Sequence, residues 1–162
     1  MSRSKLNTHC AQREGALMDE SGDVSDATWW WNTLFFNLDM AAIHWACDQP
    51  AYDIRDVSQF PYYAVEFYHW LADSTPETEW VSAMELVKSV PEDMVCDVLF
   101  AEGMALQEMI HNAVALCAVR LELPADKIPD LLHGLRLDDP WQRFRSVVEV
   151  MQESMEKLGY WA

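Results

Sequence analysis

The sequence has little of what nucleic-acid binding and nucleotide binding require. Its 162 residues include only five glycines, and they form no glycine-rich phosphate loop. Eleven lysines and arginines stand against 27 aspartates and glutamates. The lysines and arginines form no basic patch, and the sequence has no helix-turn-helix pattern with arginines on its second helix. We therefore do not expect the chain to bind nucleic acid directly.

Long hydrophobic runs are also missing. The most apolar stretch, residues 29–47, is interrupted by Asn32, Asp39 and His44, whereas a membrane span needs about 18 or more apolar residues. The N-terminus lacks the apolar core of a secretory signal peptide. The four cysteines form no Cys-x-x-Cys pair, and we interpret them as the reduced thiols of a cytoplasmic protein.

The charge that is present is strongly negative and unevenly distributed. The formal net charge at pH 7 is −16. Residues 25–119 hold fifteen acids against two bases, whereas residues 120–162 hold eight against six. Such an excess raises solubility but destabilises the compact state through self-repulsion. We interpret it as an acidic surface with a function, and solvated faces of an ordinary acidic protein are the alternative.

The periodicity of the chain predicts an all-α fold. Residues 1–24 are polar and aperiodic, which is typical of a flexible N-terminal tail, and residues 25–162 are predicted to form a single helical domain. No stretch alternates with the period of two that a strand requires. The prediction is a compact bundle of five or six helices around a long buried central helix, with helices over residues 25–47, 58–73, 76–90, 92–121, 124–132 and 140–158.

The expected hub of this bundle is the segment 92–121. It follows a Ser-Val-Pro-Glu capping pattern at 89–92 and stops before Pro124. Its residues are apolar nearly all round, which is typical of a buried helix. As one helix it would be about 45 Å long, unless Gly103 breaks it. Its single polar stripe includes Asp93, Asp97 and Glu108.

The helix predicted over 25–47 carries a carboxyl group on its buried side. Asp39 shares that side with Phe35, so it must find a hydrogen-bond donor or stay neutral. We expect the donor to be Asn32 or a nearby tyrosine or tryptophan. Asn37 falls on the opposite side of the helix.

The candidate partner-binding residues are acids that the predicted helices bring near one another. They form three groups: Asp93, Asp97 and Glu108 on the polar stripe, Asp73, Glu77 and Glu79 at a nearby turn, and Asp48, Asp53 and Asp56 at another. Rows of carboxylates on a rigid frame imitate duplex phosphates, so the basic surface of a DNA-binding protein would attract them. Tyr52 and Trp161 are candidate aromatic anchors.

These features predict a non-enzymatic acidic binding or inhibitor protein. It would occupy the basic, nucleic-acid-binding surface of a partner such as a nuclease or a defence complex. DNA-mimic anti-defence proteins and immunity proteins against nuclease toxins share this physical profile. No cofactor, metal or catalytic residue is expected. A second alternative is a helical assembly subunit, in which the aromatic-rich second helix packs against a copy of itself.

Two Glu-x-x-His pairs give a different alternative. Glu66 and His69 lie on one predicted helix, and Glu108 and His111 lie on another. The spacing resembles the ligand pattern of ferritin-like carboxylate-bridged di-iron proteins, which implies an oxidase or oxygenase with Asp39 as a fifth ligand. The sixth ligand is missing, and the second pair lies on the polar stripe rather than facing the bundle interior.

Overall fold

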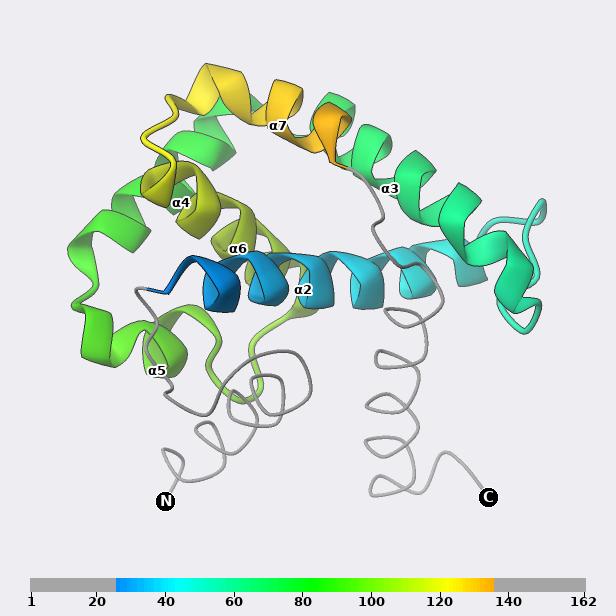
Figure 1. Cartoon of the computed structure of the whole chain (residues 1–162), viewed down its shortest axis with the longest axis horizontal. Helices are drawn as coiled ribbons and strands as arrows, with labels where there is room; N and C mark the ends of the chain where they lie inside the picture. The colour runs from blue at the N-terminus through cyan, green and yellow to red at the C-terminus, as the bar shows by residue number, and fades with distance from the viewer. Residues whose placement is uncertain (1–25, 136–162) are drawn as a thin grey trace.

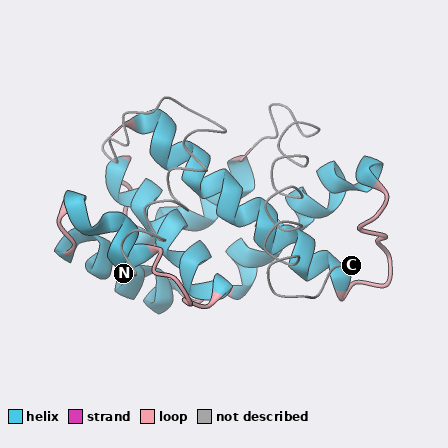
Figure 2. Cartoon of the chain, turned by 90° about the horizontal axis from the view of Figure 1, so that it is seen from below, coloured by secondary structure: helices cyan, strands magenta, loops and turns pink. Residues whose placement is uncertain are grey.

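The computed structural model describes residues 26–135, which form only helices and loops (Figures 1 and 2). The helices are α2 (Ala27–Cys47), α3 (Phe60–Ser74), α4 (Glu77–Ser89), α5 (Val95–Leu99), α6 (Leu106–Arg120) and α7 (Ile128–Gly134). Three short 3-10 turns precede α3, α5 and α7: η1 (Val57–Gln59), η2 (Glu92–Met94) and η3 (Ala125–Lys127). The predicted all-α bundle is confirmed. The predicted tail 1–24 and the helix predicted over 140–158 lie outside the described residues.

The helices begin where local hydrogen bonding favours them. The Asp26 carboxylate accepts the backbone N–H of Thr28 at 2.8 Å and of Trp29 at 3.3 Å, so it satisfies two free amides of the first turn of α2. Pro61 occupies the first turn of α3, where a missing N–H costs little. Pro76 immediately precedes α4. Within residues 26–135, no helix combines the length and apolarity needed to cross a bilayer.

Helix α6 lies at the centre of the bundle. It packs against α2, α4 and α5, while α3 packs against α2 and α7 (Figure 1). Every residue from Asn112 to Ala118 is buried. A helix buried on all sides is one that other elements surround. The second half of the predicted central helix is therefore the hub of the fold.

The predicted central helix over 92–121 does not form as one helix, because the chain breaks at Gly103, the position where the sequence left a break open. This segment consists of η2, α5 and α6, with a turn between α5 and α6. Gly103 in that turn has φ of +84°, a conformation that glycine adopts readily and other residues rarely do. The amide of Asn112 donates to the carbonyl of Leu99 at 2.9 Å, which satisfies a free acceptor at the end of α5. The chain therefore changes direction there instead of continuing as one helix.

Three polar side chains of α2 lie in the core: Thr33, Asn37 and Asp39. Asp39 is 1% exposed and accepts a hydrogen bond from the hydroxyl of Tyr68 on α3, so the expectation of a tyrosine donor is confirmed. The placement of Asn37 opposite the buried side is wrong, because Asn37 is 2% exposed. Its amide donates to the carbonyl of Thr33 at 2.8 Å, so the buried N–H is satisfied within its own helix.

Candidate functional site

The described part of the chain is strongly anionic. Residues 26–135 hold eighteen aspartates and glutamates against four lysines and arginines, a net charge of −14, and fifteen of the eighteen acids are exposed. Exposed ion pairs contribute little to stability. Among the described residues, three pairs join an acid to a lysine or arginine: Arg55–Asp53 at 3.1 Å, Arg120–Glu92 at 3.5 Å and Lys127–Asp130 at 3.9 Å.

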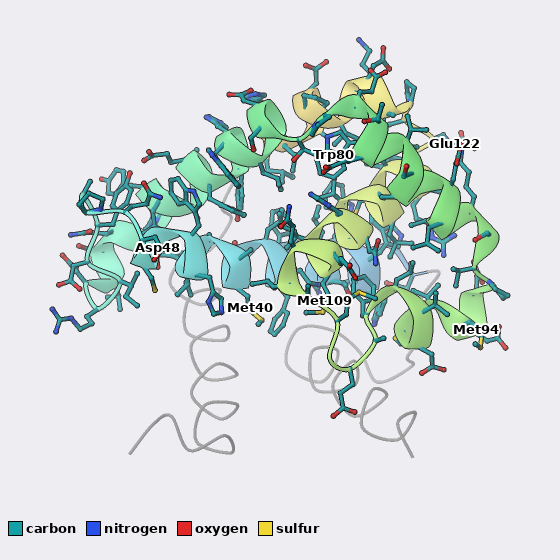
Figure 3. All side chains as sticks on the ribbon, turned by 180° about the vertical axis from the view of Figure 1, so that it is seen from behind. Met40, Asp48, Trp80, Met94, Met109 and Glu122 are labelled. Carbon is teal, nitrogen blue, oxygen red and sulfur yellow. The ribbon has the colours of Figure 1, made fainter. Side chains whose placement is uncertain are left out.

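The nine predicted partner-binding acids do not form one continuous row. They lie in four places: Asp48, Asp53 and Asp56 at the α2–α3 loop, Asp73, Glu77 and Glu79 at the α3–α4 turn, Asp93 and Asp97 on η2 and α5, and Glu108 on α6. The labelled Asp48 and Met94 mark opposite ends of the molecule (Figure 3). The polar stripe predicted along residues 92–121 does not exist, because the turn at Gly103 separates its members.

The acids of the α2–α3 loop have local structural partners. Asp53 accepts the backbone N–H of Arg55 at 3.0 Å and its Nε at 3.1 Å. Asp56 accepts the backbone N–H of Ser58 at 3.1 Å and its hydroxyl at 2.6 Å, so it caps η1. The side-chain hydrogen bonds from Arg55 and Ser58 are the main reason that the pKa of each carboxyl is lowered. This group therefore shapes the loop as well as adding charge.

The α3–α4 turn borders an open pocket of about 350 Å³. Its walls come from α2, α3, α6 and the first turn of α4. Trp45 on α2 lies beside Phe67 and Trp70 on α3, with ring centroids 5.8 Å and 6.2 Å away, and the two α3 rings are 5.8 Å apart. Trp70 is 48% exposed. Concave sites of this size, with aromatic walls and a few polar groups, are the usual form of binding pockets.

Glu79 and His111 are the ionisable groups of this pocket among its described lining residues. Glu79 Oε2 lies 3.9 Å from Nε2 of His111, whose side chain is 15% exposed. The His111 ring meets Trp80 edge-on, with centroids 5.1 Å apart. Burial lowers the pKa of His111, and the Glu79 carboxylate opposes part of this effect. At neutral pH His111 is therefore uncharged, and Glu79 supplies the charge of the pocket.

The predicted acids contribute unequally to this site. Of the nine, Glu79 lines the pocket, while Asp73 and Glu77 lie on the same turn outside it. Asp73 Oδ1 is 3.0 Å from Nε2 of His133 on α7. Glu108 is exposed and directly follows a pocket-lining residue of α6. The turn therefore combines a local excess of carboxylates with a concave aromatic surface.

The aromatic wall was not predicted as a site from the sequence. Phe67 and Trp70 lie three residues apart on one helix, a spacing that equally indicates core packing, and Trp45 joins them from another helix. The sequence instead predicted Tyr52 and Trp161 as aromatic anchors. Tyr52 is half-buried and its hydroxyl donates to a carboxylate on α3, and Trp161 lies outside the described residues. The available sequence signal was Trp70, which stands three residues before Asp73 and shortly before Glu77 and Glu79.

The two Glu-x-x-His pairs do not converge on one point. Glu66 accepts a hydrogen bond from the Tyr52 hydroxyl, and the His69 ring packs against His133 with centroids 4.6 Å apart. His111 faces the aromatic pocket instead. Within residues 26–135, no three His, Cys, Asp or Glu side chains are grouped so that they could hold a metal ion. The described residues thus do not assemble the ligand set of a di-iron protein.

Comparisons with known proteins give no relative of this chain: no protein-family model, no curated protein and no solved structure matches it. The anionic surface and the aromatic pocket are therefore the two features from which a function can be inferred.

Proposed function

We propose that this is a non-enzymatic acidic binding protein that occupies the basic, nucleic-acid-binding surface of a partner. The observation that carries the proposal is the charge balance: fifteen exposed acids against four lysines and arginines over residues 26–135. A protein that binds nucleic acid presents lysines and arginines to phosphates, and its attraction to them depends steeply on salt. A rigid anionic surface attracts the same face and competes with the nucleic acid.

The α3–α4 turn is the contact region that the geometry supports best. Asp73, Glu77 and Glu79 are exposed within seven residues, and the half-exposed Trp70 lies one turn before them. Interfaces draw most of their energy from a few aromatic and charged residues surrounded by weaker contacts. Other exposed acids lie toward the two ends of the molecule, as the labelled Asp48 and Glu122 illustrate (Figure 3).

The test is capture of partners from a lysate of the source organism on the immobilised full-length protein. We expect a nucleic-acid-binding protein to be retained at about 50 mM NaCl, lost at about 500 mM NaCl and displaced by duplex DNA. The triple variant Asp73→Lys, Glu77→Lys, Glu79→Lys should weaken capture about 10-fold or more, because like charges then face each other.

A matched control reverses three exposed acids elsewhere: Glu85→Lys, Glu122→Lys and Asp126→Lys. It changes the net charge by the same amount and should reduce capture much less. Far-UV circular dichroism should show equal helical content for both variants. Capture that tolerates high salt and excess DNA would contradict the proposed partner class. Equal weakening of capture by the two variants would contradict the proposed contact region.

One observation favours the helical assembly subunit as a second candidate. Tyr62 and Trp70 on α3 are 71% and 48% exposed, although large aromatic rings usually gain from burial. A helix with this face could pair with its copy in a homodimer. Light scattering at two protein concentrations separates the candidates, since self-association raises the apparent mass with concentration.

A further inference from the structure

We propose that the pocket beside the α3–α4 turn binds an arginine side chain of the basic partner. The proposal deepens the function proposed above and rests on it for the source of the arginine. The pocket is lined by Trp45, Phe67, Trp70, Glu79 and His111, together with apolar residues of α3 and α6. Its chemistry can be tested without knowing the partner.

The composition of the walls indicates an amphipathic cation. Leu71 and Ile110 are buried residues that contribute apolar surface to the pocket, and Glu79 contributes a carboxylate. Arginine and lysine side chains combine a long apolar stem with a charged end, so they can lie along apolar walls while the charge meets a carboxylate. A purely apolar ligand would leave the Glu79 carboxylate without a counter-charge.

The aromatic rings favour a cation further, and arginine over lysine. Tryptophan is the aromatic residue that attracts cations most strongly through its ring face. Trp45 and Trp70 both line the pocket. A planar guanidinium can stack on an indole and donate two parallel N–H groups to a carboxylate, whereas an ammonium acts as a point charge. Two indoles and a carboxylate that line the same pocket therefore match the guanidinium.

The electrostatics of the pocket also suit a cation. None of its described lining residues is lysine or arginine, and His111 is uncharged at neutral pH because burial lowers its pKa. The surrounding residues 26–135 carry a net charge of −14. A positively charged side chain thus meets attraction at long range and no opposing positive charge in the pocket.

The experiment titrates the full-length protein, labelled with ¹⁵N at tryptophan, with N-acetyl-arginine methylamide. The neutral citrulline analogue, which has nearly the same shape, and the lysine analogue are the comparison ligands. We expect saturable shifts of the indole signals of Trp45 and Trp70, identified with the variants Trp45→Phe and Trp70→Phe. The citrulline analogue should bind about 2- to 5-fold more weakly, as loss of a cation–π contact predicts.

The variant Glu79→Gln should weaken arginine binding by about 2- to 5-fold, as loss of one charge pair predicts. The matched control is Glu77→Gln, which removes the same charge two residues away on the same turn but outside the pocket. It should change the affinity less than about 1.5-fold. Shifts that do not saturate, equal binding of the citrulline analogue, or equal effects of the two variants would overturn the arginine site.

The pocket proposal and the partner proposal fail in different ways. If the arginine titration fails while salt-sensitive, DNA-displaced capture remains, the anionic surface acts without this pocket. If the titration succeeds but no nucleic-acid-binding protein is captured, the pocket binds arginine and the proposed partner class is wrong. In the expected case both succeed, and Glu79→Gln weakens capture more than Glu77→Gln does.

Discussion

At the scale of single residues, the buried pair Asp39 and Tyr68 is a place where a small substitution should lower the stability of the fold. Both side chains are buried, and the Tyr68 hydroxyl donates to the Asp39 carboxyl between α2 and α3. Tyr68→Phe keeps the ring but removes one donor from a carboxyl that water cannot reach. We expect it to lower the free energy of unfolding by about 1–3 kcal/mol in urea denaturation. Tyr62→Phe on the same helix, where the ring is 71% exposed, should change it by less than about 0.5 kcal/mol.

The same two helices show which residue environments can be read from a sequence. The donor to Asp39 was predictable, because a carboxyl on an apolar helix face requires one. The burial of Asn37 was not, because its amide reaches the carbonyl of Thr33 in its own helix and so needs no partner elsewhere. A helical wheel places Asn37 opposite the main apolar stripe, but α2 packs against both α3 and α6, so residues on more than one of its sides are buried.

For the elements, the turn between α5 and α6 decides the shape of the hub. Gly103 has φ of +84°, and no heavy atom beyond its chain neighbours lies within 4 Å of the position a Cβ would take, so a substitution would act through backbone conformation alone. Gly103→Ala should lower the free energy of unfolding by about 1–2 kcal/mol, the cost of a left-handed alanine. Gly134→Ala is the control, because Gly134 ends α7 without a positive φ. It should be neutral or stabilising by up to about 1 kcal/mol, and equal losses in thermal unfolding would refute this explanation.

Most element boundaries were predictable because local chemistry sets them. Asp26 caps α2, Pro61 lies in the first turn of α3, and Pro76 directly precedes α4. The sequence shows these three start signals directly. The sequence indicated Gly103 as a possible break inside 92–121 but could not decide it, because residues 100–105 are mostly apolar and keep the helical pattern through the glycine. The contact that favours the turn joins Asn112 to Leu99 and forms only in the folded bundle.

For the whole molecule, the sequence predicts that the candidate site is acidic, but it does not predict where on the fold the site lies. Composition shows the excess of acids, and Glu79 is both one of the nine predicted partner-binding acids and a residue of the pocket. Where the acids lie depends on the turn at Gly103, which separates groups that one long helix would have aligned. Residues of four helices line the pocket, so no pattern within one segment of the sequence could predict it.

The excess charge of the whole molecule also predicts how stability responds to salt. Fifteen exposed acids against four bases over residues 26–135 repel one another more than they pair. Raising the ionic strength from about 0.01 M to 0.1 M shortens the screening length from about 30 Å to 10 Å. We expect the midpoint of thermal unfolding to rise by about 2–4 °C, equivalent to about 1 kcal/mol for a chain of this size. Sodium chloride and sodium perchlorate should act alike at these concentrations, because screening depends on ionic strength rather than on the anion. A midpoint that falls with salt would mean that attractive ion pairs, not repulsion, dominate the surface.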